Sequence, residues 1–313
     1  MAAAERVNPK DFFTDAEWAR LNRRNLWAGP LLVAHCWAVI LAAAVMGVLV
    51  PWTIPLAVVV IGGRQLGLAI LMHDAAHRAL HPNPRVNDFL GRWLCSPVLH
   101  QYRPYHLTHH KFAQQGEDPD LVLSAPFPIT KASLRRKMIR DLTGQTFLKQ
   151  RFGIGAAMSH LKDHPKNRLA AGLRQQARLI GAGVVWTTVL ALLPGHYWWA
   201  WLVFWLLPSA TWLPLVTRLR NIAEHALVAQ GEPDPLRQAR TTHANLIERA
   251  LIAPYWVNYH CEHHMFMYLP CYRLPLAHRM LKAKGVLPRM EVRRGGYVEV
   301  LSLASSKPEP LAA

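Results

Sequence analysis

Cysteine is scarce in this sequence, and its spacing excludes several kinds of site. The 313 residues include four cysteines, Cys36, Cys95, Cys261 and Cys271, and no two of them form a CxxC pair. Disulfide frameworks and zinc knuckles depend on closely spaced cysteines. We therefore expect neither, and we expect the polar parts of the chain to face a reducing cytosol.

Acidic residues are also few. Charged side chains make up only 18% of the sequence, and 19 acidic residues stand against 36 lysines and arginines, for a formal net charge of +17. Hydrophobic residues make up 51%. The basic charge admits two interpretations, a nucleic-acid-binding protein or a membrane protein with basic cytoplasmic loops.

A secretory leader is lacking as well. The segment 1–25 is polar, and the apolar block that follows is too long for the hydrophobic region of a signal peptide. The stretch TDAE, Thr14 to Glu17, instead fits a capping box that begins a short helix. We therefore expect residues 1–25 to stay in the cytoplasm.

Long apolar blocks are present in two parts of the chain, and they predict four membrane-spanning helices. The blocks pair into two hairpins, whose connections Pro51–Thr53 and Gly195–His196 contain turn-forming residues. The predicted spans are 26–50, 54–72, 179–194 and 197–216.

Lysine and arginine avoid these blocks, with Arg64 as the exception. The segment 1–26 holds 5 of them, 73–178 holds 17 and 217–313 holds 13, and neither hairpin turn holds any. Four spans place these segments on one side of the membrane, which the positive-inside rule makes the cytoplasm. Topology thus explains the charge without nucleic acid. We expect an all-α, multi-pass integral membrane protein with both termini cytoplasmic, in which 73–178 and 217–313 form a helical cap.

Histidine is abundant, and nine of the 17 histidines lie in four short clusters. The clusters use i, i+3 and i+4 spacings, which place side chains on one face of a helix. They are HDAAH with His73 and His77, HLTHH with His106, His109 and His110, NIAEH with Asn221 and His225, and HCEHH with His260, His263 and His264.

Each cluster alone has an ordinary explanation, but together they predict a metal centre. HxxxH is common on helix surfaces, and HDAAH departs from the zinc-protease pattern HExxH because Asp74 replaces the glutamate. All four clusters lie in or beside the predicted cytoplasmic segments, so they can meet at one site. Nine neutral imidazoles would each need a donor and an acceptor, a demand that metal binding removes. Nine ligands exceed the four of tetrahedral zinc, so we expect two metal ions of undetermined identity.

The order HxxxH, HxxHH, NxxxH and HxxHH on a four-span protein resembles the membrane fatty acid desaturase family, which includes hydroxylases and carotenoid-modifying relatives. The resemblance covers residues 62–275 and includes HHKFAQQGEDPDL, RLRNIAEHA and NYHCEHHMFMYLPCYRLP. It implies a single membrane desaturase domain over 1–313, with two iron ions as cofactor and O2 as co-substrate.

The resemblance also implies which residues hold each iron. One iron would take His73, His106, His110 and His263, with Asn221 holding a water on it. The other would take His77, His109, His225, His260 and His264. The acidic residues within the boxes would orient imidazole N–H groups, and they are Asp74, Glu224 and Glu262.

Departures from the family pattern narrow the activity. The second box is HxxHH rather than the HxxxHH of alkane-hydroxylase relatives, which favours a desaturase. The last box begins with His260, where front-end desaturases have glutamine, and MFMYLP follows where many relatives have a Phe-Pro pair. The implied activity is O2-dependent introduction of a double bond into a lipid acyl or long alkyl chain.

Three alternatives stay open at this point. A lipid or carotenoid hydroxylase or ketolase would use the same di-iron site. A zinc membrane hydrolase would use the histidines for another metal. A metal transporter predicts histidines in mid-membrane, where only His35 lies, so this class is disfavoured.

The electron supply is expected to be separate. The sequence has no HPGG motif of a fused cytochrome b5 and no cysteine set for an iron–sulfur cluster. The resemblance therefore implies a ferredoxin- or cytochrome b5-type donor with its reductase. The implied location is the bacterial inner membrane or its equivalent.

Two basic features fall outside the boxes. KASLRRKMIRDLTGQTFLKQRF, from Lys131, has apolar residues at helical spacing and predicts an interfacial helix on anionic headgroups. A solvated helix and a docking face for an acidic electron carrier are the alternatives. Arg64 lies with Gln65 inside the second span. We expect it to bond to a neighbouring helix rather than to His35 or a polar substrate head.

Overall fold

A computed structural model describes residues 7–152, 177, 180–181 and 183–308. Most of these residues are helical, as predicted, and the exceptions include two three-residue strands that the prediction of an all-α fold omits. The chain forms two compact units. Met1–Ala38, Leu66–Leu134 and Thr217–Ala313 make the first, and Val39–Gln65 and Arg135–Val216 make the second.

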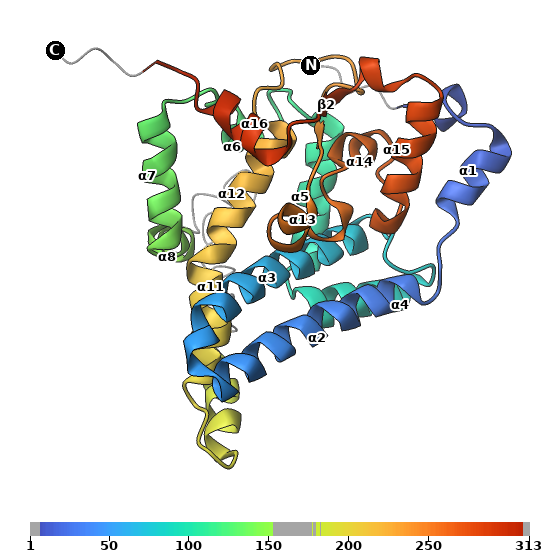
Figure 1. The fold of residues 1–313 in the computed structure, drawn as a ribbon. Coiled ribbons are helices and arrows are strands. Elements are labelled where there is room, and N and C mark those ends of the chain that lie inside the picture. The colour runs from blue at the N-terminus through green and yellow to red at the C-terminus, as the bar shows by residue number, and fades with distance from the viewer. Residues whose placement is uncertain (1–6, 153–176, 178–179, 182, 309–313) are drawn as a thin grey trace, which may run out of the picture. The chain divides into compact units, whose positions relative to one another are not determined.

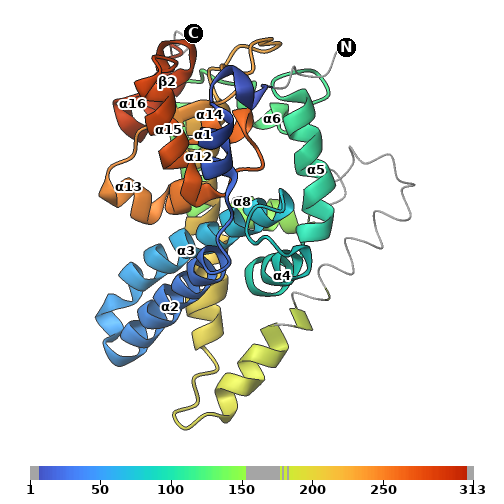
Figure 2. The same cartoon turned by 90° about the vertical axis from the view of Figure 1, so that its right-hand side faces the viewer.

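Three helices of the described residues are long and apolar enough to cross a membrane. They are α2 (Ala28–Leu49), the helix Pro51–Ala76 that contains α3 (Ile54–Ala76), and Leu202–His225, which ends in α12 (Trp212–His225). In α2, Leu41 and Leu49 are 59% and 73% exposed, as lipid-facing side chains should be. The helices α2 and α3 run side by side as a hairpin, as predicted (Figures 1 and 2).

The fourth predicted span, 197–216, overlaps a long apolar helix that runs over Leu202–His225, and the boundaries of the span within it stay a prediction. Hydropathy falls after residue 216, but the polar stretch that follows continues the helix and buries Ile222 and Ala223. Within the third predicted span, 179–194, the described residues Gly183–Leu192 form a shorter apolar helix. Residues 179 and 182 of that prediction lie outside the described residues.

The first unit contains the elements that surround the C-terminal end of α3. Its N-terminal helix α1 (Asp15–Asn22) begins with the predicted capping box, in which the Thr14 side chain accepts from Glu17 N and Glu17 accepts from Thr14 N. The other elements are α4 (Pro84–Phe89), η3 (Leu90–Cys95), α5 (Leu99–Phe112), α6 (Leu121–Ser124), α13 (Leu246–Leu251), α14 (His260–Met265), α15 (Leu274–Ala283), η7 (Leu287–Arg289) and α16 (Gly296–Ala304).

The core of this unit fixes α14 in place. Phe266, which follows α14, packs against Phe13 and Trp18 at ring-centroid distances of 5.4 and 5.5 Å. The strands β1 (Arg240–Thr242) and β2 (Glu291–Arg293) pair in parallel beside it. A six-residue helix is too short to be stable alone, so this packing holds its histidines in position.

The second unit contains α7 (Lys131–Leu142) from Arg135 onward and α8 (Gln145–Phe152), where the sequence predicts one basic helix. Gly144 separates them with φ of +76°, a conformation that glycine adopts without strain. Within the same unit the Gln65 side-chain amide donates to Trp205 O at 2.9 Å, so Gln65 bonds between helices. The interhelical bond expected for Arg64 stays a prediction.

Candidate metal centre

Four elements of the first unit bring the histidines together. His73 lies in the last turn of α3 and His77 just beyond it, while α5 carries the second box and α14 the last. His225 is the final residue of α12. Because each box occupies a helix or its end, the i, i+3 and i+4 spacings point imidazoles into one space, as the sequence predicts.

The end of α3 is held by two side chains that satisfy its free carbonyls. Arg103 donates to Ala76 O and Ala75 O, both at 3.0 Å, and its guanidinium also pairs with Asp88 at 2.5 Å. Asn87 donates to Ala75 O at 2.9 Å. These bonds replace the hydrogen bonds that the last helical turn lacks, and they fix the backbone from which His73 and His77 project.

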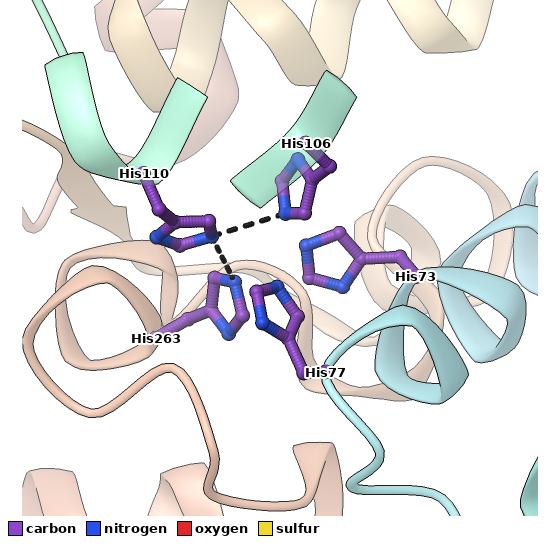
Figure 3. A group of neighbouring side chains, drawn as sticks. All are labelled: His73, His77, His106, His110 and His263. Carbon is purple, nitrogen blue, oxygen red and sulfur yellow. Dashed lines mark hydrogen bonds between the residues drawn. The ribbon is translucent and has the colours of Figure 1, made fainter. Parts of the chain in front are cut away.

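The larger histidine group comes from α3, α5 and α14 (Figure 3). The ligand-capable atoms of its members lie within 4.8 Å of one another, and the members are His73, His77, His106, His110 and His263. His110 Nε2 lies 3.0 Å from His106 Nε2 and 3.0 Å from His263 Nε2. Figure 3 shows the five rings facing a shared central space.

Two smaller groups adjoin the first. One contains His109, His225 and His264, and the other contains Glu224, His225 and His260. His109 Nε2 is 3.3 Å from His264 Nε2, and His225 Nε2 is 2.9 Å from His260 Nε2. Because His225 belongs to both, these four histidines form one continuous cluster.

The larger group and this second cluster are in contact. The rings of His110 and His264 stack with centroids 4.3 Å apart. His77 lies with the larger group, with ring centroids 4.7 Å from His110 and 4.8 Å from His263. The resemblance assigns His77 to the second iron, so the division of ligands between two ions stays a prediction.

The unsatisfied ring nitrogens fit bound metal. Among the described residues, several buried nitrogens have no hydrogen-bond partner, and they are His73 Nε2, both nitrogens of His77, His225 Nδ1 and His260 Nδ1. His110 Nε2 faces both His106 Nε2 and His263 Nε2. It cannot pair with both, because each nitrogen of a neutral imidazole makes one hydrogen bond, either as the donor or as the acceptor. Buried polar atoms are normally paired, and coordinated metal would occupy these lone pairs.

Burial keeps most of the rings neutral. Burial, followed by the charges of His109 and Arg103, lowers the pKa of His77 to about 3. Burial and the neighbouring imidazoles lower the pKa values of His106 and His110 well below their ordinary value. Neutral imidazole is the form that binds metal, so the site is ready to coordinate at neutral pH.

His109 differs because it has an acidic partner that the sequence analysis missed. Asp118 accepts a hydrogen bond from His109 Nδ1 at 2.8 Å, and both side chains are 2% exposed. Burial opposes the protonated form, but the hydrogen bond and charge of Asp118 outweigh it and raise the pKa of His109. The bond leaves Nε2 to face the cluster, which is how a carboxylate fixes the tautomer of a metal-binding histidine.

The signal for Asp118 lies in the stretch GEDPD, only nine residues after His109. The loop folds back because Asp118 also accepts from Gln114 N and Asp120 N, both at 2.9 Å. Asp120 adds a weaker contact, 3.8 Å from His109 Nδ1. The short distance in sequence between GEDPD and His109 therefore could have predicted an acidic partner for this histidine.

The three acidic residues within the boxes lie in different environments. Asp74 accepts from Cys271 N at 2.8 Å and is 4.0 Å from His73 Nδ1. Glu224 pairs with Arg220 at 2.7 Å and has an oxygen 3.5 Å from His260 Nε2.

Glu262 is fully buried and contacts no box histidine through its carboxylate. Its oxygens accept from Thr241 Oγ1 and from His278 Nδ1, the latter at 2.5 Å. Asn221 lies half-buried on α12, one turn before His225. The orienting roles and the water-holding role expected for these residues stay predictions.

Comparison with known proteins finds one matching family and several relatives of similar sequence. The chain matches the fatty acid desaturase family over residues 49–295. It is 29% identical to dihydrorhizobitoxine desaturase of Bradyrhizobium elkanii, over 80% of this chain and 74% of that protein. It is 25% identical to sn-1 oleoyl-lipid 12-desaturase of Arthrospira platensis, over 72% and 67% of the two chains. It is 23% identical to the chloroplastic omega-6 fatty acid desaturase of Brassica napus, over 74% and 55%.

Proposed function

Because the chain belongs to the fatty acid desaturase family, and is thus an oxidoreductase, we propose that it is an O2-dependent di-iron desaturase that introduces a double bond into a lipid acyl or long alkyl chain. The observation that carries the di-iron proposal is the pair of contacting, buried histidine clusters. The relatives reported above are all named desaturases, which favours desaturation over hydroxylation.

Two iron ions fit the donor set, because imidazole suits iron and the nine histidines exceed what one ion takes. When bound, the irons would supply O2 activation and hydrogen abstraction from an unactivated C–H bond. One iron would be held by His73, His106, His110 and His263, with a water on Asn221. The other would be held by His77, His109, His225, His260 and His264.

The residues around the cluster would control water and protons. His106, His109 and His263 are 2–3% exposed, so the surrounding helices exclude bulk solvent. Asp118 holds the proton of His109 on Nδ1. Forming one double bond removes two hydrogens from the substrate. Together with two external electrons and two protons, these reduce O2 to two waters.

The family and the apolar helices support proposals for the substrate, the membrane topology and the electron donor. Membrane association and a lipid substrate fit the three apolar helices, and the Arthrospira relative is named for an oleoyl-lipid substrate. We propose four spans, a cytoplasmic helical cap, cytoplasmic termini and a bacterial inner-membrane location. A separate ferredoxin- or cytochrome b5-type protein with its reductase would deliver the electrons.

Metal analysis of the purified protein tests the proposal without relying on turnover. The wild type should hold two irons per chain, and His109→Ala should hold fewer and lose desaturation. Chelation should abolish turnover, and iron should restore it. Zinc in place of iron would contradict the proposal and favour a hydrolase, and full desaturation without iron would also contradict it.

A further inference from the structure

A second site lies on the first unit, and none of the nine box histidines lines it. It is a hollow of about 530 Å³ between α15, η7 and β2, and we call it the basic hollow. Its polar lining is entirely basic or imidazole, and its other wall is apolar. The lining residues are His243, His278, Lys282, Arg294, Leu287, Pro288, Met290 and Val292.

The surroundings of the basic hollow are strongly positive. Residues 273–294 contain 7 lysines and arginines and one acidic residue, Glu291. That glutamate is already paired with Arg240 and Arg293. In the described part of the chain, Lys282 and Arg294 have no carboxylate within ion-pair distance, and both are exposed. Their charges are therefore available to a partner.

The titration of His243 agrees with this field. Burial lowers the pKa of His243, and its electrostatic interactions with His278 and Arg294 lower it further. A positive potential disfavours adding another proton. The pKa of His243 thus changes in the direction that the basic lining of the hollow predicts.

One side chain of the basic hollow connects directly to the helix that carries the last histidine box. His278 Nδ1 donates to the Glu262 carboxylate at 2.5 Å, and the same residue lines the hollow. Glu262 lies on α14 immediately before His263. The path from the hollow to this histidine therefore consists of one hydrogen bond and the covalent chain of two adjacent residues.

We propose that the basic hollow docks an acidic one-electron carrier protein, and that electrons enter the metal centre through His278 and Glu262. The inference rests on the proposed function, because only an electron-consuming enzyme needs such a donor. Each docking oxidises the carrier by one electron, so two dockings supply the two electrons for one double bond.

Charge distinguishes the electron route through His278 and Glu262 from two other routes that connect the protein surface to the histidine cluster. The route through His109 passes Asp118 and Asp120, whose carboxylates repel an acidic partner. The route through Glu224 reaches the surface at Arg220, whose charge this glutamate already neutralises. Complementary charge accelerates and orients protein docking, and the basic hollow combines an unneutralised charge with a short path.

The test measures binding of a purified acidic [2Fe–2S] ferredoxin to the iron-loaded chain in nanodiscs, by biolayer interferometry at low ionic strength. The double variant Lys282→Glu with Arg294→Glu should raise the Kd by about tenfold or more. Added salt should weaken wild-type binding and reduce the difference between the two proteins. The matched control reverses Arg135 and Arg136 on α7, an equal charge change on the other basic face, and should leave the Kd unchanged.

Three results would overturn the docking proposal. The Kd of the double variant could equal that of the wild type, or the α7 control could weaken binding equally. Inorganic phosphate could bind the wild type and not the double variant while ferredoxin binds both alike, which would assign the hollow to a small anion. The proposed function fails separately, if the wild type forms no double bond whatever its affinity for ferredoxin.

Discussion

Replacing Asp118 should weaken metal binding without removing a ligand. Its two oxygens accept three hydrogen bonds, from His109 Nδ1 and Asp120 N on Oδ1 and from Gln114 N on Oδ2. An asparagine has one acceptor oxygen, so Asp118→Asn must place its NH2 group against at least one of these donors. If the amide oxygen takes the Oδ1 position, the bond to His109 survives in a weaker, neutral form.

The magnitudes follow from this geometry. One buried N–H without a partner costs about 1–3 kcal/mol of stability. Loss of the partner of a metal-binding histidine lowers metal affinity by about 10–100-fold. We expect Asp118→Asn near the lower end of that range and Asp118→Ala, which frees His109 Nδ1 altogether, near the upper end.

The assay is competition of the purified variants for Fe(II) against a chelator of known affinity, with bound metal measured by mass spectrometry. Asp120→Asn is the control, because its carboxylate is 3.8 Å from His109 Nδ1 and accepts mainly from Tyr105 Oη. Thermal unfolding of the metal-free proteins separates a stability effect from an affinity effect. Wild-type metal affinity in a folded Asp118→Ala variant would refute the reasoning.

Two further predictions concern the packing and ends of the membrane helices. A Cβ on Gly62 would lie 2.7 Å from Trp212 Cβ. Gly62→Ala should therefore destabilise the protein by about 1–3 kcal/mol. The control is Gly181→Ala, which has open space around it and should not lower the midpoint of thermal unfolding. Arg103→Ala removes the charged hydrogen bonds to Ala75 O, Ala76 O and Asp88, and it should lower the free energy of unfolding by about 3 kcal/mol. Arg85→Ala on the neighbouring α4 is the control. An equal loss of stability in both variants would contradict a role of Arg103 in holding the end of α3.

Much of the site was predictable because its signals are local. The i, i+3 and i+4 spacings of HDAAH and HLTHH determine which rings share a helix face, and the structure brings all nine histidines together. The capping box at Thr14 was predictable for the same reason, since both partners lie within one helical turn.

Features that depend on tertiary contacts were not predictable in this way. The helix that overlaps the predicted fourth span continues to His225, because burial of Ile222 extends it beyond its apolar stretch. Glu262 bonds His278, 16 residues away, rather than a box histidine. Only the fold of α15 against α14 creates that contact, and no spacing in the sequence indicates it.

The most direct test of the central claim is the mass of the lipid product. Lipids from cells that express the wild-type chain, compared by mass spectrometry with those from cells that express His109→Ala, should contain acyl or alkyl chains lighter by two hydrogens and without added oxygen. Products that gain an oxygen atom would contradict desaturation and identify a hydroxylase, and identical lipid profiles would contradict an oxidative role in these cells.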